Sequence, residues 1–412
     1  LDLSKINGNY PAAAPLFDVK DGDNNGKNRV KLGYTVGTPQ IGKTQNGKYA
    51  AFLASGYAAK DINSNDNKTA LYVYDLNNTL GTPIAKIEVK DGKGGLSSPT
   101  LVDKDLDGTV DIAYAGDRGG NMYRFDLSDS NPSKWSVRTI FEGTKPITSA
   151  PAVSRLADKR VVIFGTGSDL SEQDVLDTKE QYIYGIFDDD TANVSVKVKD
   201  HMGGGLLEQV LSEENKTLFL SNNKASGGST DKGWVVKLKE GQRVTVKPTV
   251  VLRTAFVTIR KYKDDGCGAQ TAILGINTAD GGALTPRSAR PIVPEANKDV
   301  AQYSGHKTAG GKSVPIGCMW KNSKTVCPNG YVYDKPVNVR YLDETETDGF
   351  STTADGDAGG SGIDPADRRP GKNNRCFSKK GVRTLLMNDL DSLDITGPMC
   401  GIKRLSWREV FF

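Results

Sequence analysis

A recurring group of three strand-like segments is the feature that most constrains the fold of this chain. Each group begins with a strand marked by a proline, at Pro39, Pro99, Pro151 and Pro248. An apolar strand follows, at 50–54, 111–115, 160–164 and 255–259, and then a third strand at 71–75, 122–126, 182–186 and 272–276. Units of about 40 to 60 residues with about four strands are typical of propeller blades, which bury their faces against their neighbours. The repeat predicts an all-β propeller.

The spacing of the repeat sets the expected number of blades. The marking prolines are 60, 52 and 97 residues apart, and the last interval is close to twice the first two. We therefore expect a unit without its proline between Pro151 and Pro248, with strands at 217–220 and 234–238. Five units then lie between residues 32 and 285, and the flanks, 1–31 and 286–412, have room for one or two more. The prediction is a modified, quinoprotein-like propeller of seven blades.

The whole chain is expected to be a single propeller domain, over residues 1–412. Its blade repeats are clearest in 32–285, and residues 286–412 form an elaborated closing region. Within that region, residues 343–374 are rich in Asp, Gly, Ser and Thr and nearly free of large apolar groups, so we expect a mobile loop. The alternating segment 401–410 is expected to be the strand that closes the propeller.

Composition agrees with a turn-rich β protein and argues against two kinds of partner. Hydrophobic residues make up 37% of the chain, which also holds 46 glycines. The net charge is +4 with no long basic run, so no nucleic acid partner is expected. No apolar stretch approaches the roughly 18 residues that span a bilayer. The chain begins at Leu1 without an initiator Met or a signal peptide, and we expect a fragment of a longer precursor.

One loop carries the strongest signal for a ligand. Carboxylates stand at positions 1, 3, 5 and 9 of a nine-residue loop, as Asp103, Asp105, Asp107 and Asp111. EF-hand loops bind calcium with oxygens from positions 1, 3 and 5 and the backbone carbonyl of position 7, here Thr109, and a glycine at position 6 permits the bend. Apolar runs on both sides predict a hairpin turn without EF-hand helices. A plain acidic turn is the alternative, but four unneutralised carboxylates repel one another, so the loop predicts a Ca²⁺ site.

Other polar segments carry weaker signals. The loop from Asp21 to Gly26 resembles a second calcium loop, but its position 9 is Arg29, so a turn is expected first. The segment 61–67 lacks the glycine and is expected to be a polar loop. No nucleophile elbow or Walker loop is present, and we expect no catalytic site. The segments 201–205 and 165–167 are expected to be turns, and the acidic loop with Asp169, Glu172, Asp174 and Asp177 is expected to be solvated.

All the cysteines lie in the C-terminal part of the chain: Cys267, Cys318, Cys327, Cys376 and Cys400. Cys318 with Cys327, and Cys376 with Cys400, are spaced so that disulfides could close short segments, although sequence does not fix the connectivity. Disulfides imply an oxidising, extracytoplasmic compartment. The fifth, Cys267, is either a free buried thiol or the partner of a cysteine outside this chain. The chain has no CxxC pair, so its cysteine spacing does not indicate a zinc site.

Several of these features together resemble the C-terminal domain of the PilC family of type IV pilus-associated adhesins. They are the blade repeats, the Asp103–Asp111 loop between the first two strands of a blade, the turn at 165–167, the Asp265–Gly268 segment and the Ser406–Glu409 ending. The resemblance covers nearly the whole chain. The calcium loop and the chain ending are its most specific parts.

The resemblance implies a propeller at the bacterial outer membrane surface or pilus tip. Family members support pilus assembly against retraction and twitching motility, calcium tunes that activity, and the full-length protein helps attachment to host cells. The implied partners are pilus components, including minor pilins, and a host-cell receptor. The resemblance carries the calcium positions over to Asp103, Asp105, Asp107, the Thr109 carbonyl and Asp111. Some members have an integrin-binding RGD, whereas this chain has only Asp117–Gly120 in its place.

Two other functional classes share the expected fold. A propeller lectin or general binding module would bind glycans without pili. A quinoprotein dehydrogenase would need a central catalytic carboxylate, a metal ion and a stacking Trp, and we recognise no such constellation among the chain's four tryptophans.

Overall fold

Antiparallel strands make up almost all of the structure, which is a computed structural model. It describes residues 30–282, apart from gaps at 59–61, 63–67, 79–81, 191–194, 215–216, 225–230, 252 and 264–268, and beyond residue 282 eight separate strands. Within these residues the helices are one short α-helix, α1 (Glu172–Leu176), and one 3-10 turn, η4 (Pro132–Lys134). The predicted all-β class is confirmed.

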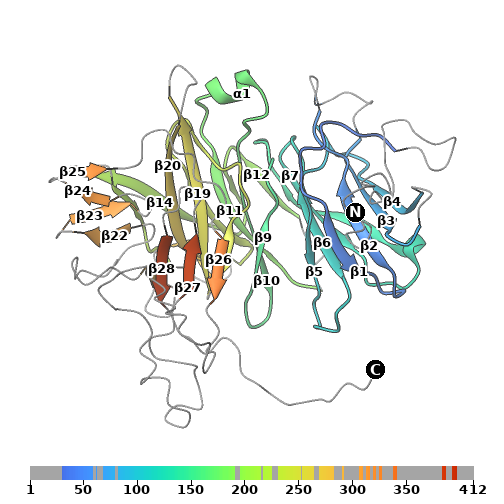
Figure 1. Ribbon diagram of the computed structural model, residues 1–412. Coiled ribbons are helices and arrows are strands. Elements are labelled where there is room, and N and C mark those ends of the chain that lie inside the picture. The colour runs from blue at the N-terminus through green and yellow to red at the C-terminus, as the bar shows by residue number, and fades with distance from the viewer. Residues whose placement is uncertain are drawn as a thin grey trace, which may run out of the picture.

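Four sheets follow one another along residues 30–282, and each is built around a four-stranded antiparallel meander or a variant of it. Sheet 1 is β1 (Gln40–Lys43), β2 (Tyr49–Ala54), β3 (Ala70–Asp75) and β4 (Pro83–Glu88) in that order. Sheet 2 has β5 (Thr100–Val102), β6 (Ile112–Gly116), β7 (Asn121–Asp126) and β8 (Ser136–Glu142), extended by β12 (Val196–Lys199) and β13 (Met202–Gly203). Figure 1 shows the sheets side by side in chain order, with sheet 1 at the right.

Sheet 3 corrects the expected unit without a proline. It runs β9 (Ala152–Arg155), β10 (Arg160–Gly165), β11 (Tyr182–Asp188), β16 (Gly233–Lys237), β14 (Leu206–Glu214) and β15 (Thr217–Leu220). The segments expected to form their own unit therefore belong to the blade that starts at Pro151. The reason is the strand pairing. β16 pairs antiparallel with β11, from Tyr182↔Lys237 to Ile186↔Gly233, and is therefore the fourth strand of sheet 3. The long interval reflects an insertion between β11 and β16.

Sheet 4 ends the regular part of the chain. It contains β17 (Gln242–Arg243), β18 (Thr249–Val251), β19 (Thr254–Tyr262) and β20 (Ala269–Asn277), with β19 at its centre. The described residues between 32 and 285 thus form four sheets, where the sequence predicted five units. The number seven for the blades of the whole chain stays a prediction.

Further strands lie beyond residue 282. One sheet joins β21 (Arg290–Pro291), β28 (Ser392–Thr396), β27 (Arg383–Leu386) and β26 (Val337–Arg340). Two hairpins pair β22 (His306–Ala309) with β23 (Lys312–Pro315), and β24 (Met319–Lys321) with β25 (Lys324–Val326). The Asp21 loop, all but Ile62 of segment 61–67, the five cysteines, the insert 343–374 and the closing segment 401–410 lie outside the described residues.

The central strands send alternate side chains into two different cores. In β10, Val162 and Phe164 pack into the core between sheets 2 and 3, whereas Val161 and Ile163 pack into the core between sheets 3 and 4. A third core between sheets 1 and 2 includes Phe52 of β2. Because successive side chains of a strand point to opposite faces, a wholly apolar strand is stable only with a sheet on each side. Each large side chain fully buried in this way contributes about 1.5–3 kcal/mol.

Trp234 connects sheets 3 and 4 at one point of close packing. Its side chain is fully buried, and its indole Nε1 donates a hydrogen bond to the Thr278 carbonyl at 3.0 Å, just beyond β20. Directly across from Trp234, β11 carries Gly185, where an added Cβ would lie 2.1 Å from the Trp234 ring. The indole therefore occupies space that only glycine leaves free.

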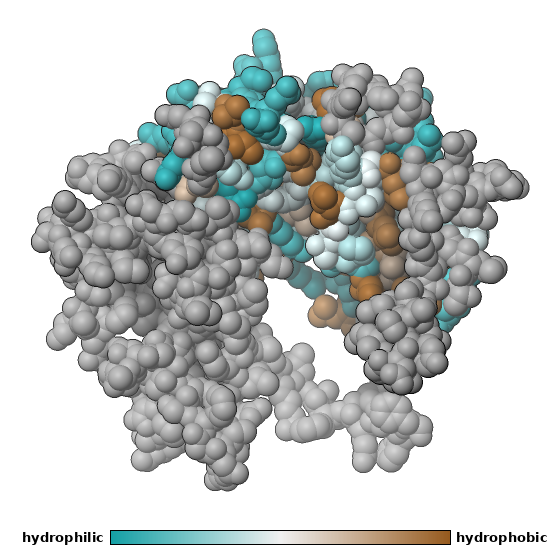
Figure 2. All heavy atoms as spheres, turned by 45° about the horizontal axis from the view of Figure 1, so that its top comes forward, coloured by the Kyte–Doolittle hydropathy of each residue, from teal (hydrophilic) through white to brown (hydrophobic). Residues whose placement is uncertain are grey.

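The surface of the described part is mixed in polarity. In Figure 2, hydrophobic residues lie in separate groups between hydrophilic ones on the face shown. Large hydrophobic side chains are nevertheless exposed at several described positions: Tyr34, Val36, Ile41, Tyr49, Leu106, Leu176 and Val210. No helix among the described residues is long and apolar enough to cross a membrane.

The close fit between Gly185 and Trp234 predicts that a methyl group added at Gly185 lowers stability much more than one added at an open position. Gly185→Ala should lower the free energy of unfolding by about 1–3 kcal/mol, because the methyl overlaps the indole in a filled core. Gly204→Ala is the matched control: no atom lies within 4 Å of its added Cβ, so the change should stay within about 0.5 kcal/mol. Urea unfolding of both variants measures the difference. Equal losses would contradict this account of the core.

Candidate functional site

The acidic loop connects β5 to β6 and is fixed at its C-terminal end by three backbone hydrogen bonds. The Asp111 N–H donates to the Val102 carbonyl at 3.0 Å, and the Asp111 carbonyl accepts from Leu127 N–H at 2.7 Å. The Val110 N–H donates to the carbonyl of Lys43 at 2.8 Å. Since Lys43 ends β1, the loop is attached to sheet 1 as well as to its own sheet. The hairpin between two strands predicted from the sequence is confirmed.

The carboxylate of Asp103 organises the turn of the loop. It accepts hydrogen bonds from the N–H groups of Leu106 at 2.6 Å, Asp107 at 3.2 Å and Gly108 at 2.8 Å. The backbone reverses through two left-handed residues, Leu106 with φ 65° and Gly108 with φ 89°. Glycine adopts this conformation without steric cost, which is the role expected for position 6 of a calcium loop.

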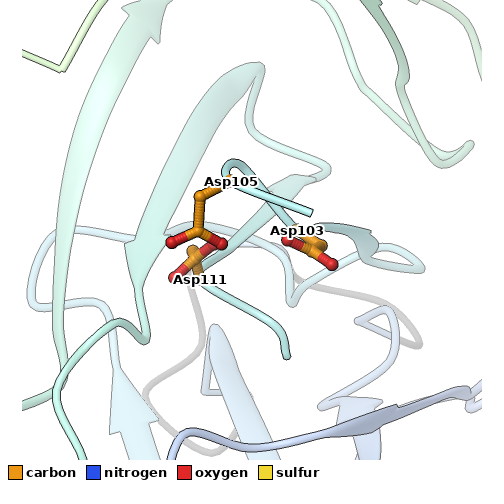
Figure 3. A group of neighbouring side chains, drawn as sticks. All are labelled: Asp103, Asp105 and Asp111. Carbon is orange, nitrogen blue, oxygen red and sulfur yellow. The ribbon is translucent and has the colours of Figure 1, made fainter. Parts of the chain in front are cut away.

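Three of the four predicted carboxylates converge. Asp103, Asp105 and Asp111 can each offer one oxygen so that all three lie within 4.8 Å of one another, and Figure 3 shows these side chains grouped at the loop. Asp111 is 2% exposed. Burial raises the pKa of its carboxyl, and the charge of Asp105 raises it further, although hydrogen bonds from Lys104 and Gln45 act in the opposite direction.

The fourth carboxylate, Asp107, is turned to a different partner. Its Oδ1 accepts hydrogen bonds from the backbone N–H of Thr109 at 2.7 Å and from the Thr109 hydroxyl at 2.6 Å. These bonds from Thr109 lower the pKa of Asp107, which therefore stays ionised. Asp107 and Thr109 are thus bound to one another by two hydrogen bonds.

Two side chains that contact the loop were not predicted from the sequence, and both come from neighbouring sheets. Gln45, between β1 and β2, donates from Nε2 to Asp111 Oδ1 at 2.9 Å and to the Thr109 hydroxyl at 2.5 Å. Arg155, the last residue of β9, donates to the Lys104 carbonyl at 3.5 Å. The loop therefore touches sheets 1 and 3. No local signal marks Gln45, because its part depends on how two blades pack together.

The donor set suits a hard divalent cation. The converging atoms are carboxylate oxygens, which calcium and magnesium prefer, and neither an imidazole nor a thiolate belongs to the cluster. Burial is the main cause that raises the pKa of Asp111, and the nearby charge of Asp105 raises it further, so the two carboxylates repel each other. A bound cation would reverse this repulsion, so the residues present fit a calcium ion.

The acidic loop around α1 differs from its prediction as a solvated segment. Asp174 forms an ion pair with Arg118 at 3.2 Å. Asp169 forms an ion pair with Arg260 at 2.8 Å and accepts a hydrogen bond from the Tyr262 hydroxyl at 3.1 Å. Two of the four acidic side chains are thus bound to basic residues of other blades, which sequence spacing does not reveal.

The segment 201–205, which was predicted to be a turn, includes a polar contact of His201. His201 lies at the turn before β13, where its ring stacks on Tyr182 and its Nε2 lies 2.9 Å from Glu208 Oε1.

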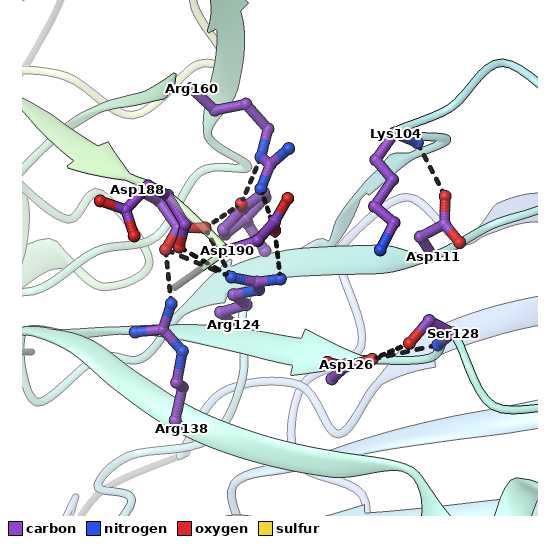
Figure 4. A network of polar contacts seen from close by, with 11 residues as sticks. Lys104, Asp111, Arg124, Asp126, Ser128, Arg138, Arg160, Asp188 and Asp190 are labelled. Atoms are coloured by element: carbon purple, nitrogen blue, oxygen red, sulfur yellow. Dashed lines mark hydrogen bonds and ion pairs between the residues drawn. The ribbon is translucent and has the colours of Figure 1, made fainter. Parts of the chain in front are cut away.

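A polar junction with a buried centre lies between sheets 2 and 3, and its members pair with one another. We define it as Tyr114, Arg124, Arg138, Arg160, Asp188 and Asp190. Asp188, 3% exposed, accepts from Arg138 at 2.6 Å, from Arg124 at 3.3 Å and from the Tyr114 hydroxyl. Figure 4 shows the contacts of Asp188 with Arg124 and Arg138, together with the Lys104–Asp111 bond. Because the charges are satisfied internally, the junction serves the packing of the two sheets.

Comparison with known proteins finds one matching family model and several proteins of similar sequence. Residues 1–224 match a family model described as the PilY1 beta-propeller domain. Type IV pilus biogenesis factor PilY1 of Pseudomonas aeruginosa is 28% identical over 366 residues, which is 73% of this chain and 31% of that protein. A PilY1 homolog of Xylella fastidiosa is 34% identical over 125 residues, 27% of this chain and 8% of the homolog. The chain spans less than a third of the length of these curated relatives.

A solved structure shares the fold. The crystal structure of the Pseudomonas aeruginosa PilY1 C-terminal domain aligns with a TM-score of 0.61 at 20% sequence identity, over 90% of this chain and 74% of that chain.

The polar junction predicts a large cost for removing its central carboxylate. Asp188→Ala should lower the free energy of unfolding by about 3–5 kcal/mol, because Arg124 and Arg138 lose a buried counter-charge. Asp158→Ala, at an exposed position of the β9–β10 turn, is the control and should change stability by less than about 0.5 kcal/mol. Denaturant unfolding measures both. A cost for Asp188→Ala no larger than that of the control would show that the junction does not hold the sheets together.

Proposed function

The chain belongs to the PilY1 β-propeller family and corresponds to the C-terminal domain of PilC/PilY1 proteins, and on this premise we propose that it is the calcium-binding regulatory domain of a type IV pilus-associated adhesin. In this role it supports pilus assembly against retraction, twitching motility and attachment to host cells. Its task is binding and regulation, without catalysis. The relatives named above are type IV pilus biogenesis factors, which supports the pilus part of the proposal.

The calcium part rests on one observation: three carboxylates converge on a loop that contacts two neighbouring blades. The residues that would hold the ion are Asp103, Asp105, Asp107, the Thr109 carbonyl and Asp111. When bound, the ion supplies positive charge to these oxygens. An ion that binds only the folded domain stabilises it by about 2.7 kcal/mol at a hundredfold excess over Kd.

The loop's contacts explain how ion binding would reach a partner. Asp103 orders the turn through three N–H groups, and Asp111 is held by Gln45 of sheet 1 and by the Lys104 N–H at 2.8 Å. Neutralising these carboxylates favours the single arrangement in which the loop joins sheets 1, 2 and 3. A pilus component that distinguishes this arrangement from the loose one would sense calcium.

The remaining parts of the proposal concern place and partners. The domain would lie outside the cytoplasm, at the bacterial outer membrane surface or the pilus tip, and would be secreted there as part of a larger protein. Minor pilins and a host-cell receptor are the proposed partners. The fold is proposed to be a modified seven-bladed, quinoprotein-like propeller, with disulfides among its C-terminal cysteines.

Calorimetric titration with calcium tests the ligand assignment. The wild type should show one site, and Asp105→Ala should weaken it more than about tenfold, because affinity follows the number of charged ligands. Asp107→Ala should weaken it less, because the Asp107 carboxylate accepts two hydrogen bonds from Thr109 and would have to give them up to bind the ion. Asp158→Ala is the control and should bind like the wild type. Absence of heat in the wild type, or equal binding by Asp105→Ala, would contradict the proposal.

The raised pKa of Asp111 predicts proton competition with calcium. The ion binds the ionised carboxylate, so binding is full above this pKa and falls as the pH drops through it. Because burial raises the pKa of Asp111 above its ordinary value of 3.8, affinity should fall at a higher pH than it would for a site whose carboxylates all had that ordinary value. Calcium titrations at a series of pH values measure this. Affinity that stays constant down to pH 3.8 would contradict a role for Asp111.

A further inference from the structure

The tip of the β1–β2 hairpin places Gln45 beside the acidic loop. Thr44, which is 1% exposed, donates its backbone N–H to the Lys48 carbonyl at 2.8 Å, and its carbonyl accepts from the Gly47 N–H at 2.9 Å. Gly47 has a φ of 81°, a conformation that glycine adopts at a hairpin turn without steric cost. The backbone of Gln45 is therefore enclosed by the hairpin's own hydrogen bonds.

The side chain of Gln45 contacts two residues of the acidic loop at once. Its Nε2 donates to Asp111 Oδ1 at 2.9 Å and to the Thr109 hydroxyl at 2.5 Å. An ionised carboxylate only accepts hydrogen bonds, so the amide nitrogen, and not the amide oxygen, must face Asp111. One amide from the neighbouring blade thus connects positions 7 and 9 of the loop.

The Asp111 carboxylate is held through both of its oxygens. Oδ1 accepts from Gln45, and Oδ2 accepts from the Lys104 N–H at 2.8 Å. Lys104 belongs to the loop itself and Gln45 belongs to the β1–β2 hairpin, so the orientation of the carboxylate depends on two blades. Asp111 is also the buried member of the group that converges with Asp103 and Asp105. The Gln45 bond therefore fixes a carboxylate at the centre of the candidate site.

We propose that Gln45 is a positioning residue of the calcium site and couples ion binding to the β1–β2 hairpin of the neighbouring blade. This inference rests on the calcium-binding function proposed above. Groups that hydrogen-bond a metal ligand fix its orientation, and removing them typically weakens metal binding about 10- to 100-fold. The amide donors of Gln45 face the carboxylate, so the residue acts through Asp111.

A second contact between hairpin and loop runs through the backbone. The Val110 N–H donates to the Lys43 carbonyl at 2.8 Å, and a Cβ added at Gly42 would lie 2.5 Å from a methyl carbon of Val110. The hairpin thus contacts the loop closely at β1 as well as at Gln45. Because coupling between two binding or folding events is reciprocal, ion binding should stabilise the hairpin, and loosening the hairpin should weaken ion binding.

Calorimetric titration of Gln45→Met with calcium tests the inference on the whole chain. Methionine keeps the length of the side chain and removes both donor N–H groups, so calcium binding should weaken about tenfold or more. Gln40→Met is the matched control, because Gln40 lies in β1 of the same hairpin and its amide donates to the Thr38 and Pro39 carbonyls instead of the loop. It should bind calcium like the wild type.

Two further measurements separate positioning from a general loss of structure. The luminescence lifetimes of bound Eu³⁺ in H₂O and D₂O report the water molecules on the ion. In Gln45→Met alone, water should replace the Asp111 carboxylate that is no longer held in place. Hydrogen exchange gives the reciprocal readout: calcium should slow the exchange of the Thr44 and Gly47 amides in the wild type and in Gln40→Met, and much less in Gln45→Met.

The outcomes distinguish this inference from the function on which it rests. A wild type that binds no calcium would overturn both. Calcium binding by Gln45→Met with wild-type affinity and wild-type bound water would leave the calcium function standing and overturn the role of Gln45, as would an equal loss in Gln40→Met. If Gln45→Met does not fold, the wild type decides: hairpin amides whose exchange calcium does not slow would overturn the coupling.

Discussion

Burial on both faces of the central strands is the constraint on which the rest of the structure depends. Strands such as β3 and β6 have every residue buried, so their sheets cannot be stable alone and must lie between two neighbours. The three cores between sheets 1 to 4 satisfy this need for β6, and each is shared by two blades. The other face of β3, with Tyr72 and Tyr74, packs in a separate cluster with Val30. Polar contacts such as the Asp188 junction then fix how adjacent blades meet. Every loop at a sheet end consequently lies close to the next blade.

The acidic loop takes its character from that arrangement. Taken alone, it is a turn organised by Asp103; packed between blades, it has Asp111 buried beside Gln45 of sheet 1 and Lys104 in contact with Arg155 of sheet 3. Burial makes the negative charge of Asp111 costly without a cation, and the raised pKa of its carboxyl expresses that cost.

Local patterns predicted the strands and the position of the acidic loop, whereas long-range pairing was not predictable. The strands β2, β6, β10 and β19 were recognisable because a buried strand requires a run of consecutive apolar residues. The insertion before β16 was mistaken for an extra blade, because the sequence of a strand does not determine which strand it pairs with. The aspartate spacing identified the loop, but whether Asp107 faces an ion or Thr109 depends on side-chain rotation. The partners of Asp169 and Asp174 come from other blades, so their solvation was predicted wrongly.

The most direct test of the calcium site is anomalous diffraction from crystals of this domain soaked in a lanthanide, which replaces calcium at oxygen sites. The account predicts one strong peak at the loop, about 2.4 Å from oxygens of Asp103, Asp105 and Asp111. The same map would show whether Asp107 and the Thr109 carbonyl complete the coordination. A loop without a peak, while lanthanide binds elsewhere on the molecule, would contradict the central claim.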